Sequence, residues 1–153
     1  MNDLELTIQQ NKVFEKIIAF LNSDASVFIL RGYAGTGKTT MVKVIADYIE
    51  QSRHLVMMAP TGRAARVLAM KTGHTAVTIH KAIYTKAHVE LKKVKDVAES
   101  EFKFVFPINQ SENGGNIVAI VDEASMVCSR KIEHELFVYG TDNLMEDLLT
   151  FVR

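Results

Sequence analysis

The stretch Gly32-Tyr33-Ala34-Gly35-Thr36-Gly37-Lys38-Thr39 decides the fold that this sequence predicts. It matches the pattern G-x-x-x-x-G-K-[ST] at every required position. Glycines let consecutive backbone N–H groups turn inward, and a helix that starts near Lys38 adds its positive end. In such a loop the Lys38 ammonium reaches the β- and γ-phosphates of ATP, and the Thr39 hydroxyl coordinates Mg²⁺. The alternative is a glycine-rich turn that binds nothing.

The segments on both sides of this loop have the patterns that a phosphate-binding loop requires. Residues 26–30 form a short apolar run, typical of a buried strand. Residues 38–50 have a helical period, with Met41, Ile45 and Ile49 on the apolar face. A further helix is predicted at 6–22, where Thr7 is placed to cap the first turn.

The rest of the chain alternates between strand and helix patterns. Apolar strands are predicted at 55–58 and 117–121, with a helix at 62–71 that ends at Gly73. This alternation predicts an α/β domain with a mostly parallel sheet between layers of helices. The pattern breaks at 86–116, which we interpret as an inserted hairpin. After it, two helices are predicted at 129–139 and 143–152, separated by Gly140.

An acidic pair follows the strand predicted at 117–121. Asp122 and Glu123 stand at its carboxyl end, the edge at which ligand sites of open α/β sheets collect. There Asp122 would hold Mg²⁺, and Glu123 would orient and deprotonate an attacking water. The alternative is an exposed acidic turn, but beside the phosphate-binding loop we favour the magnesium and water sites.

Composition narrows the function further. Among 153 residues, 18 basic side chains balance 18 acidic ones, so nucleic-acid binding would need a local basic patch. Cys128 is the only cysteine, which excludes an intrachain disulfide and a cysteine-based zinc site; we expect an inert thiol. The N-terminus lacks a signal-peptide pattern, and no apolar stretch approaches the roughly 20 residues that span a bilayer. We therefore expect a cytoplasmic protein with no membrane partner.

Four motifs occur in a fixed order along the chain. They are Gly-Tyr-Ala-Gly-Thr-Gly-Lys-Thr-Thr at 32–40, Ala-Pro-Thr-Gly-Arg-Ala-Ala-Arg at 59–66, Thr-Ile-His-Lys at 78–81 and Asp-Glu-Ala-Ser-Met at 122–126. This set resembles the RecD-like branch of the superfamily I DNA helicases. The resemblance implies a RecA-like P-loop NTPase fold and ATP hydrolysis coupled to 5′ to 3′ translocation on single-stranded DNA. It adds Thr40 to the nucleotide-binding residues and gives Lys38 and Glu123 catalytic roles.

The same resemblance assigns contacts to DNA and to adenine. Its first DNA-contacting element covers Pro60, Thr61, Gly62, Arg63 and Arg66, and its next one covers Thr78 and His80. A Thr-Gly turn that opens a helix offers N–H groups and a hydroxyl to a phosphate, although a capped surface helix with solvated arginines also fits. The adenine-reading element corresponds to 6–10 and assigns Gln10 to the adenine edge, because an amide donates and accepts together. Thr7 and Gln10 also form a capping-box pattern, and the two roles are compatible.

The insertion stands where this family carries a small domain, often a hairpin that acts as a wedge. Phe102, Phe104 and Phe106 alternate, so they share one face if the stretch is a strand. They either stack on bases or bury the strand against the domain, and we favour burial.

The sequence ends before the position at which the family has a strand with a Gly-Asp…Gln element. The family places that strand between those predicted at 26–30 and 117–121, and a second motor domain with an arginine finger follows. We therefore expect a single truncated domain over 1–153 that binds nucleotide with little turnover, unwinds nothing, and either self-associates through the incomplete sheet or rearranges it. Two alternatives fit part of the pattern: a P-loop ATPase or kinase that does not act on DNA, and a nucleotide-binding interaction module.

Overall fold

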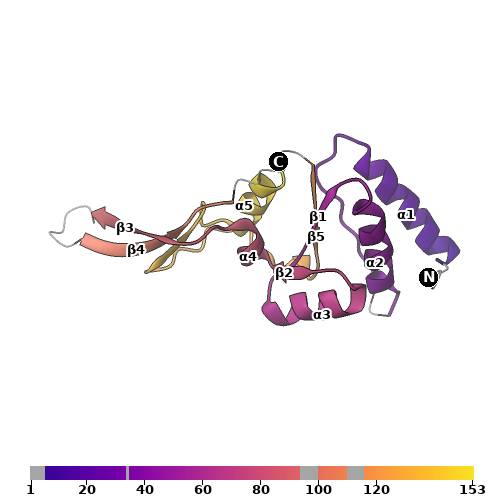
Figure 1. The fold of residues 1–153 in the computed structure, drawn as a ribbon, viewed down its shortest axis with the longest axis horizontal. Coiled ribbons are helices and arrows are strands. Elements are labelled where there is room, and N and C mark those ends of the chain that lie inside the picture. Colours follow the sequence, from indigo (N-terminus) through magenta and orange to yellow (C-terminus); the bar gives the residue numbers. More distant parts are fainter. Residues whose placement is uncertain (1–5, 34, 94–99, 110–115) are drawn as a thin grey trace.

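The computed structural model describes residues 6–33, 35–93, 100–109 and 116–153. In chain order, its elements are α1 (Ile8–Leu21), α2 (Lys38–Ile49), β1 (His54–Ala59), α3 (Gly62–Thr72), β2 (Ala76–Thr78), α4 (Ile79–Ile83), β3 (His88–Lys93), β4 (Ser100–Phe106), β5 (Ile117–Val121), the 3₁₀ helix η1 (Ala124–Met126), β6 (Phe137–Tyr139) and α5 (Leu144–Phe151). Figure 1 shows a body that contains α1, α2 and α3, and a narrow sheet that projects from it. Within the described ranges, no helix has the length and apolar character needed to cross a membrane.

The body is built on a parallel sheet of order β2-β1-β5. Successive residues of β1 point to opposite faces, so Met57 and Met58 enter separate cores. On one face Met57 packs with Ala46 of α2 and Leu68 of α3. On the other face Met58 packs with residues of α4 and α5, namely Ile79, Ile83, Leu148 and Phe151. Helices therefore cover both faces of the sheet, which confirms the predicted α/β P-loop fold class.

Helices α1, α2 and α3 confirm those predicted at 6–22, 38–50 and 62–71. Strands β1 and β5 confirm those predicted at 55–58 and 117–121. Their local signals act as predicted. Thr7 caps α1 and accepts a hydrogen bond from the Gln10 N–H, while Gly73 ends α3 with a φ of 80°. The core face of α2 consists of Met41, Ile45 and Ile49, which pack with Ile17 of α1.

The projecting sheet, which we call the arm, has the order β3-β4-β6. β3 and β4 form an antiparallel hairpin within 86–116, and β6 pairs with β4 in the parallel sense. The base of the arm continues directly from α4, where the Thr85 N–H donates to the Pro107 carbonyl at 2.8 Å. The chain enters the arm after α4 and returns to the body from β4 to β5; it enters the arm again between η1 and β6 and leaves it after β6.

The helix predicted at 129–139 is wrong, whereas α5 confirms the one predicted at 143–152. The final three residues of the first range form β6, and residues 130–136 belong to no helix or strand. Pairing explains the difference: the Phe104 N–H donates to the Leu136 carbonyl at 2.8 Å, and β6 then continues along β4. A strand partner about thirty residues away overrides the local helical pattern.

The buried strand predicted at 26–30 is also wrong. These residues form no strand, and Val27 and Ile29 are 58% and 68% exposed. Phe28 packs instead on Phe20 of α1, with ring centroids 5.5 Å apart. A strand forms only where a partner satisfies its backbone groups. None of the described strands pairs with residues 26–30, although β5 has a free edge in the described sheet.

Candidate functional site

The loop at 32–37 leads directly into the N-terminus of α2. Gly35 and Gly37 have φ values of 79° and 78°, in the left-handed region that favours glycine. Gly37 is the N-cap residue of α2, and Lys38 is its first helical residue. Two left-handed glycines just before a helix produce a turn whose N–H groups and helix terminus form a site for an anion. Ala34 lies outside the described residues.

The ammonium of Lys38 folds back over this loop. It donates hydrogen bonds to the carbonyls of Gly32 at 2.6 Å and Tyr33 at 2.7 Å. The Thr36 hydroxyl donates to the same Tyr33 carbonyl at 2.9 Å. A fixed positive charge therefore lies at the loop, while Thr39 and Thr40 are half-buried in the first turn of α2.

At two glycines of the loop, an added Cβ would force a neighbouring side chain to move. A Cβ at Gly32 would lie 2.9 Å from the Thr36 hydroxyl oxygen, and one at Gly37 would lie 2.6 Å from the Gln10 amide nitrogen. Bare backbone, an ammonium, hydroxyls and a helix N-terminus are the donors that a triphosphate with Mg²⁺ requires. The residues present therefore fit the predicted ATP and Mg²⁺.

Gln10 connects α1 to this loop. Its N–H donates to the Thr7 hydroxyl at 3.3 Å, and its side-chain oxygen accepts from the Thr7 N–H at 2.9 Å. The capping box is confirmed, and it turns the amide nitrogen toward Gly37. The assignment of Gln10 to adenine stays a prediction.

The acidic pair stands at the carboxyl end of β5. The Asp122 N–H donates to the Met58 carbonyl at 2.9 Å, which extends the pairing with β1 by one residue. The Glu123 N–H donates to the Asp122 carboxylate at 3.0 Å. Glu123 has a φ of 51°, a strained conformation for a residue with a side chain, and such strain clusters at functional sites. Both carboxylates are exposed and available to a ligand.

The two segments predicted to contact DNA lie at the same edge of the sheet. The register pairs Ala59 with Thr78 and Met58 with Val121, so the residues after β1, β2 and β5 are neighbours. Thr61 caps α3 and accepts from the Ala64 N–H at 3.2 Å. Thr78 caps α4 and accepts from the Lys81 N–H at 3.2 Å. Two residues of the first segment, Arg63 and Arg66, are exposed on α3.

The structure brings these edge residues together but does not join all parts of the predicted site. No hydrogen bond or ion pair of the described residues links Asp122 or Glu123 to Lys38 or Thr39. The phosphate-binding loop and the acidic pair are connected through the core instead, where Met41 of α2 packs in the same cluster as Val118 and Ile120 of β5.

His80 lies among aromatic rings at the base of the arm. Its ring centroid is 5.6 Å from that of Tyr84 and 5.3 Å from that of Tyr139. Burial lowers the pKa of His80, and the nearby His134 lowers it further. His80 is therefore neutral near pH 7 and can donate and accept one hydrogen bond each. The motif identifies His80 in the sequence, but no local signal predicts its contact with Tyr139.

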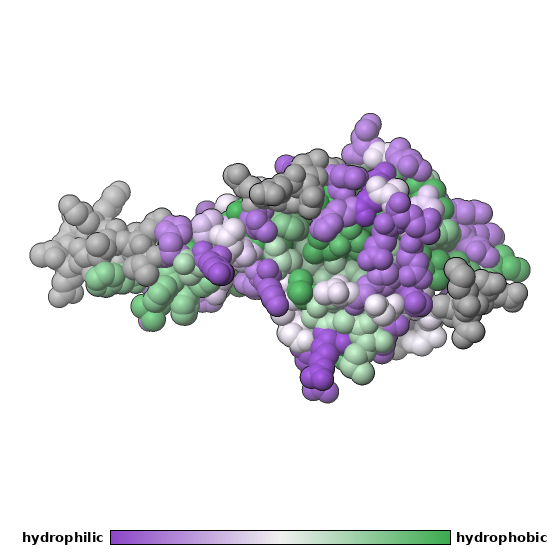
Figure 2. Space-filling model, viewed as in Figure 1, coloured by the Kyte–Doolittle hydropathy of each residue, from purple (hydrophilic) through white to green (hydrophobic). Residues whose placement is uncertain are grey.

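The three alternating phenylalanines of β4 differ in exposure. Phe106 is half-buried and stacks on Tyr139, with centroids 4.6 Å apart and planes at 17°. Phe104 and Phe102 are 42% and 62% exposed. Burial, the interpretation we favour, is therefore correct for Phe106 and wrong for the two residues farther out, because the arm extends beyond the body. Figure 2 shows hydrophobic atoms at the surface of this projecting part.

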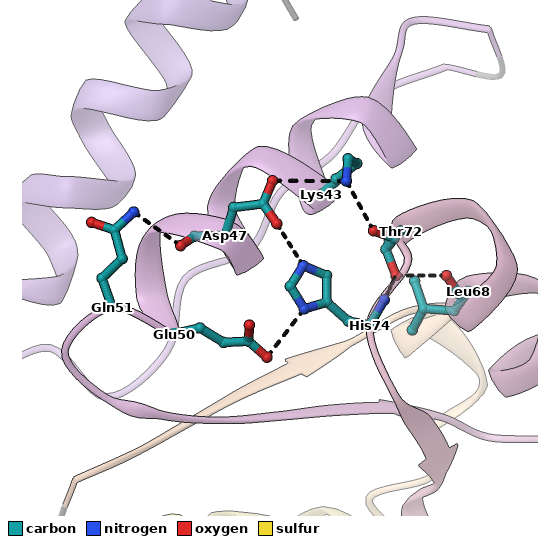
Figure 3. Close-up of polar contacts among 7 residues, drawn as sticks. All are labelled: Lys43, Asp47, Glu50, Gln51, Leu68, Thr72 and His74. Atoms are coloured by element: carbon teal, nitrogen blue, oxygen red, sulfur yellow. Dashed lines mark hydrogen bonds and ion pairs between the residues drawn. The ribbon is translucent and has the colours of Figure 1, made fainter. Parts of the chain in front are cut away.

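A polar cluster joins α2 to the segment after α3 (Figure 3). The imidazole of His74 lies between the carboxylate of Asp47 in α2, 2.7 Å from Nε2, and that of the C-cap residue Glu50, 3.1 Å from Nδ1. Lys43 of the same helix donates to the Thr72 carbonyl at 3.3 Å. These contacts fix the helix that follows the phosphate-binding loop against the helix that carries Arg63.

Comparison with known proteins agrees with this geometry. Residues 5–139 match the AAA domain family. An uncharacterized protein of Methanocaldococcus jannaschii is 31% identical over 126 residues, which are 77% of this chain and 10% of that protein. The ATP-dependent RecD2 DNA helicase of Deinococcus radiodurans is 45% identical over 36% of this chain and 8% of its own length. The ATP-dependent DNA helicase dda of Enterobacteria phage T4 is 31% identical over 50% of this chain and 18% of its own. The chain thus spans less than a fifth of each of these relatives.

Proposed function

This chain belongs to the AAA domain family, and from that membership we propose that it is the ATP-binding motor domain of a DNA helicase of the RecD-like branch. The observation that carries the proposal is the loop at 32–37, in which two left-handed glycines lead into α2 and the Lys38 ammonium is held above them. Similarity to two proteins named as ATP-dependent DNA helicases supports DNA as the substrate on which the motor acts.

The division of labour at the site follows from the chemistry of each side chain. The N–H groups at 32–37, Lys38 and the Thr40 hydroxyl would hold the phosphates, and Gln10 would read adenine. Thr39 and Asp122 would hold Mg²⁺, which supplies charge neutralisation during phosphoryl transfer. Glu123 would accept the proton of the attacking water. Lys38 would stabilise the negative charge that develops on the transferred phosphoryl group.

Single-stranded DNA would cross the edge at which β1, β2 and β5 end. Pro60, Thr61 and Gly62 open α3 there, and Arg63 and Arg66 supply positive charge. Thr78 and His80 open α4 at the neighbouring position. Hydroxyls, arginines and a helix N-terminus position a phosphate backbone without reading its sequence.

We also propose that the domain over 1–153, with its hairpin insertion at 86–116, functions together with another protein segment that completes its sheet. The free edge of β5 and the exposed apolar run at 26–30 could both be satisfied by one added strand. In a full-length helicase that strand and a second motor domain would come from the same chain. In the isolated chain, a second copy is the alternative partner through the incomplete sheet.

Calorimetry with Mg-ATP and Mg-ADP tests the nucleotide site. We expect binding by the wild-type chain and a loss of at least tenfold in affinity for Lys38→Ala, since a charged hydrogen-bond donor to phosphate is removed. Lys43→Ala is the matched control, because it removes a lysine of the same helix whose partners are Asp47 and Thr72. Absence of binding by folded wild-type protein would refute the proposal.

Fluorescence anisotropy with a labelled oligothymidylate tests the DNA site. We expect affinity to fall as salt rises, and Arg63→Ala and Arg66→Ala to weaken binding and reduce the salt slope, each by about one phosphate contact. Lys71→Ala is the control, because it removes a cation from the last turn of the same helix. Because little turnover is expected of this chain, binding separates the first alternative: a P-loop ATPase or kinase that does not act on DNA would bind Mg-ATP but not the oligothymidylate. ATP turnover of the full-length protein separates the second, since an interaction module would show none.

A further inference from the structure

Asp147 is a buried carboxylate that none of the roles above uses. It lies in the first turn of α5 and is 0% exposed. The ion pairs of the described residues include no cation at this carboxylate. Burying an acid without a counter-ion is costly unless hydrogen bonds satisfy its oxygens, so the donors that reach this carboxylate decide its role.

Neutral donors from two separate segments converge on this carboxylate. The Tyr84 hydroxyl donates to Oδ2 at 2.6 Å. The Thr141 hydroxyl donates to Oδ1 at 2.8 Å, and the Thr141 N–H lies 3.1 and 3.2 Å from the two oxygens. Gly140, with a φ of 48°, allows this approach, because a Cβ there would collide with the carboxylate.

These donors come from two of the places at which the chain passes between the arm and the body. Tyr84 ends α4, and its N–H donates to the His80 carbonyl at 3.2 Å. Thr141 follows β6, and the preceding Gly140 N–H donates to the Phe106 carbonyl of β4 at 3.0 Å. The rings of Tyr84, Tyr139 and His80 pack against one another with centroids 5.3 to 5.6 Å apart. Figure 1 places α4 and α5 between the arm and the central sheet.

We propose that Asp147 is a positioning residue that fixes α4, with Thr78 and His80, relative to the arm. One carboxylate accepts from the end of α4 and from the turn after β6, so the two cannot shift independently without losing a charged hydrogen bond. The proposal rests on the proposed function in one respect: Asp147 would affect DNA affinity indirectly, through Thr78 and His80.

Conservative changes in the donors test this without removing the buried acid. Thr141→Val removes the hydroxyl and keeps the size of an exposed side chain, and Thr141→Ser is the matched control that keeps the hydroxyl. Tyr84→Phe removes the second hydroxyl donor and keeps the ring. Hydrogen exchange resolved by segment, NMR of the His80 ring and affinity for an oligothymidylate are measured on each.

We expect Thr141→Val and Tyr84→Phe to raise exchange about tenfold at 79–84 and 137–143 while β1 and β5 exchange as in the wild type. The His80 resonances shift, oligothymidylate affinity falls about fivefold to tenfold, and Mg-ATP affinity stays unchanged. Thr141→Ser behaves as the wild type.

Wild-type exchange at 79–84 in both variants would overturn the proposal. Hydrogen exchange that rises equally in β1, β5 and the arm would also overturn it, because Asp147 would then contribute to overall stability like any other core residue. If the wild type binds no oligothymidylate, the proposed function fails, and the exchange and His80 measurements still decide whether Asp147 positions α4.

Discussion

Replacing Gly37 with alanine is expected to destabilise the chain about twice as much as replacing Gly35. Both residues have φ values near 78°, so both substitutions introduce left-handed strain of about 1–2 kcal/mol. Lower freedom of the unfolded chain offsets about 0.4–1 kcal/mol of that. The net cost at Gly35, where nothing lies within 4 Å of the added Cβ, is therefore about 1 kcal/mol.

At Gly37 the added Cβ also meets the Gln10 amide nitrogen at 2.6 Å. The Gln10 side chain must move, and its 2.9 Å hydrogen bond from the Thr7 N–H is lost. Such a bond contributes about 1 kcal/mol, which brings the total for Gly37→Ala to about 2 kcal/mol. The assay is urea unfolding followed by circular dichroism, which gives the free energy of unfolding. In thermal unfolding, the extra cost corresponds to a further decrease in Tm of about 2–4 °C for a chain of this size.

A Gln10→Ala background isolates the contact. With the amide removed, Gly37→Ala should cost no more than Gly35→Ala, about 1 kcal/mol, and the double-mutant cycle gives the coupling between α1 and the loop. Equal costs of the two glycine substitutions in the wild-type background would refute the reasoning. So would a difference that persists when Gln10 is absent.

Three further predictions concern the packing around the site. Asp47→Asn should lower the free energy of unfolding by at most about 1 kcal/mol in a urea titration, because the carboxylate that contacts His74 and Lys43 is half exposed; a loss of several kcal/mol would contradict this. NMR titration should place the pKa of His80 below its ordinary value of 6.5, and His134→Ala should raise it. Because the folded state disfavours protonation of His80, its contribution leaves stability unchanged above pH 6.5 and reduces it as the pH falls below that value; a pKa above 6.5 would reverse the sign. Phe106→Ala should destabilise the chain by about 3 kcal/mol, whereas Phe102→Ala should change stability by less than about 0.5 kcal/mol, and equal effects in thermal unfolding would refute the difference in burial.

Shared packing connects the loop at 32–37 with the segments that are predicted to contact DNA. Met41 and Ile45 of α2 pack with Val118 and Ile120 of β5, so the helix after the phosphate-binding loop and the strand before Asp122 share a core. His74 joins the same helix to the segment after α3. A shift of α2 on nucleotide binding would therefore reach both the acidic pair and the helix that carries Arg63.

Several features depend only on residues that are close in the sequence, so the sequence alone could predict them. The glycines at 35 and 37 are required by a turn that only glycine adopts easily, and Thr7, Thr61 and Gly73 cap or end helices through contacts with their own neighbours. The apolar period of α2 indicates which of its faces is buried, and the continuous apolar run of β5 indicates a strand covered on both faces. For these residues the information lies within a few positions along the chain, so the phosphate-binding loop and the sheet edge could be predicted.

Tertiary structure decided the features that depend on a distant partner. The apolar run at 26–30 has the composition of a strand but lies outside the sheet, because no strand of the described residues pairs with its backbone groups. Residues 137–139 become β6 only because β4 offers its backbone groups. From the sequence, Asp147 is an acidic residue in the first turn of a helix. Only the structure shows that it accepts hydrogen bonds from Tyr84 at the end of α4 and from Thr141 after β6. Backbone hydrogen bonds must find partners somewhere, and a one-dimensional pattern does not specify which segment supplies them.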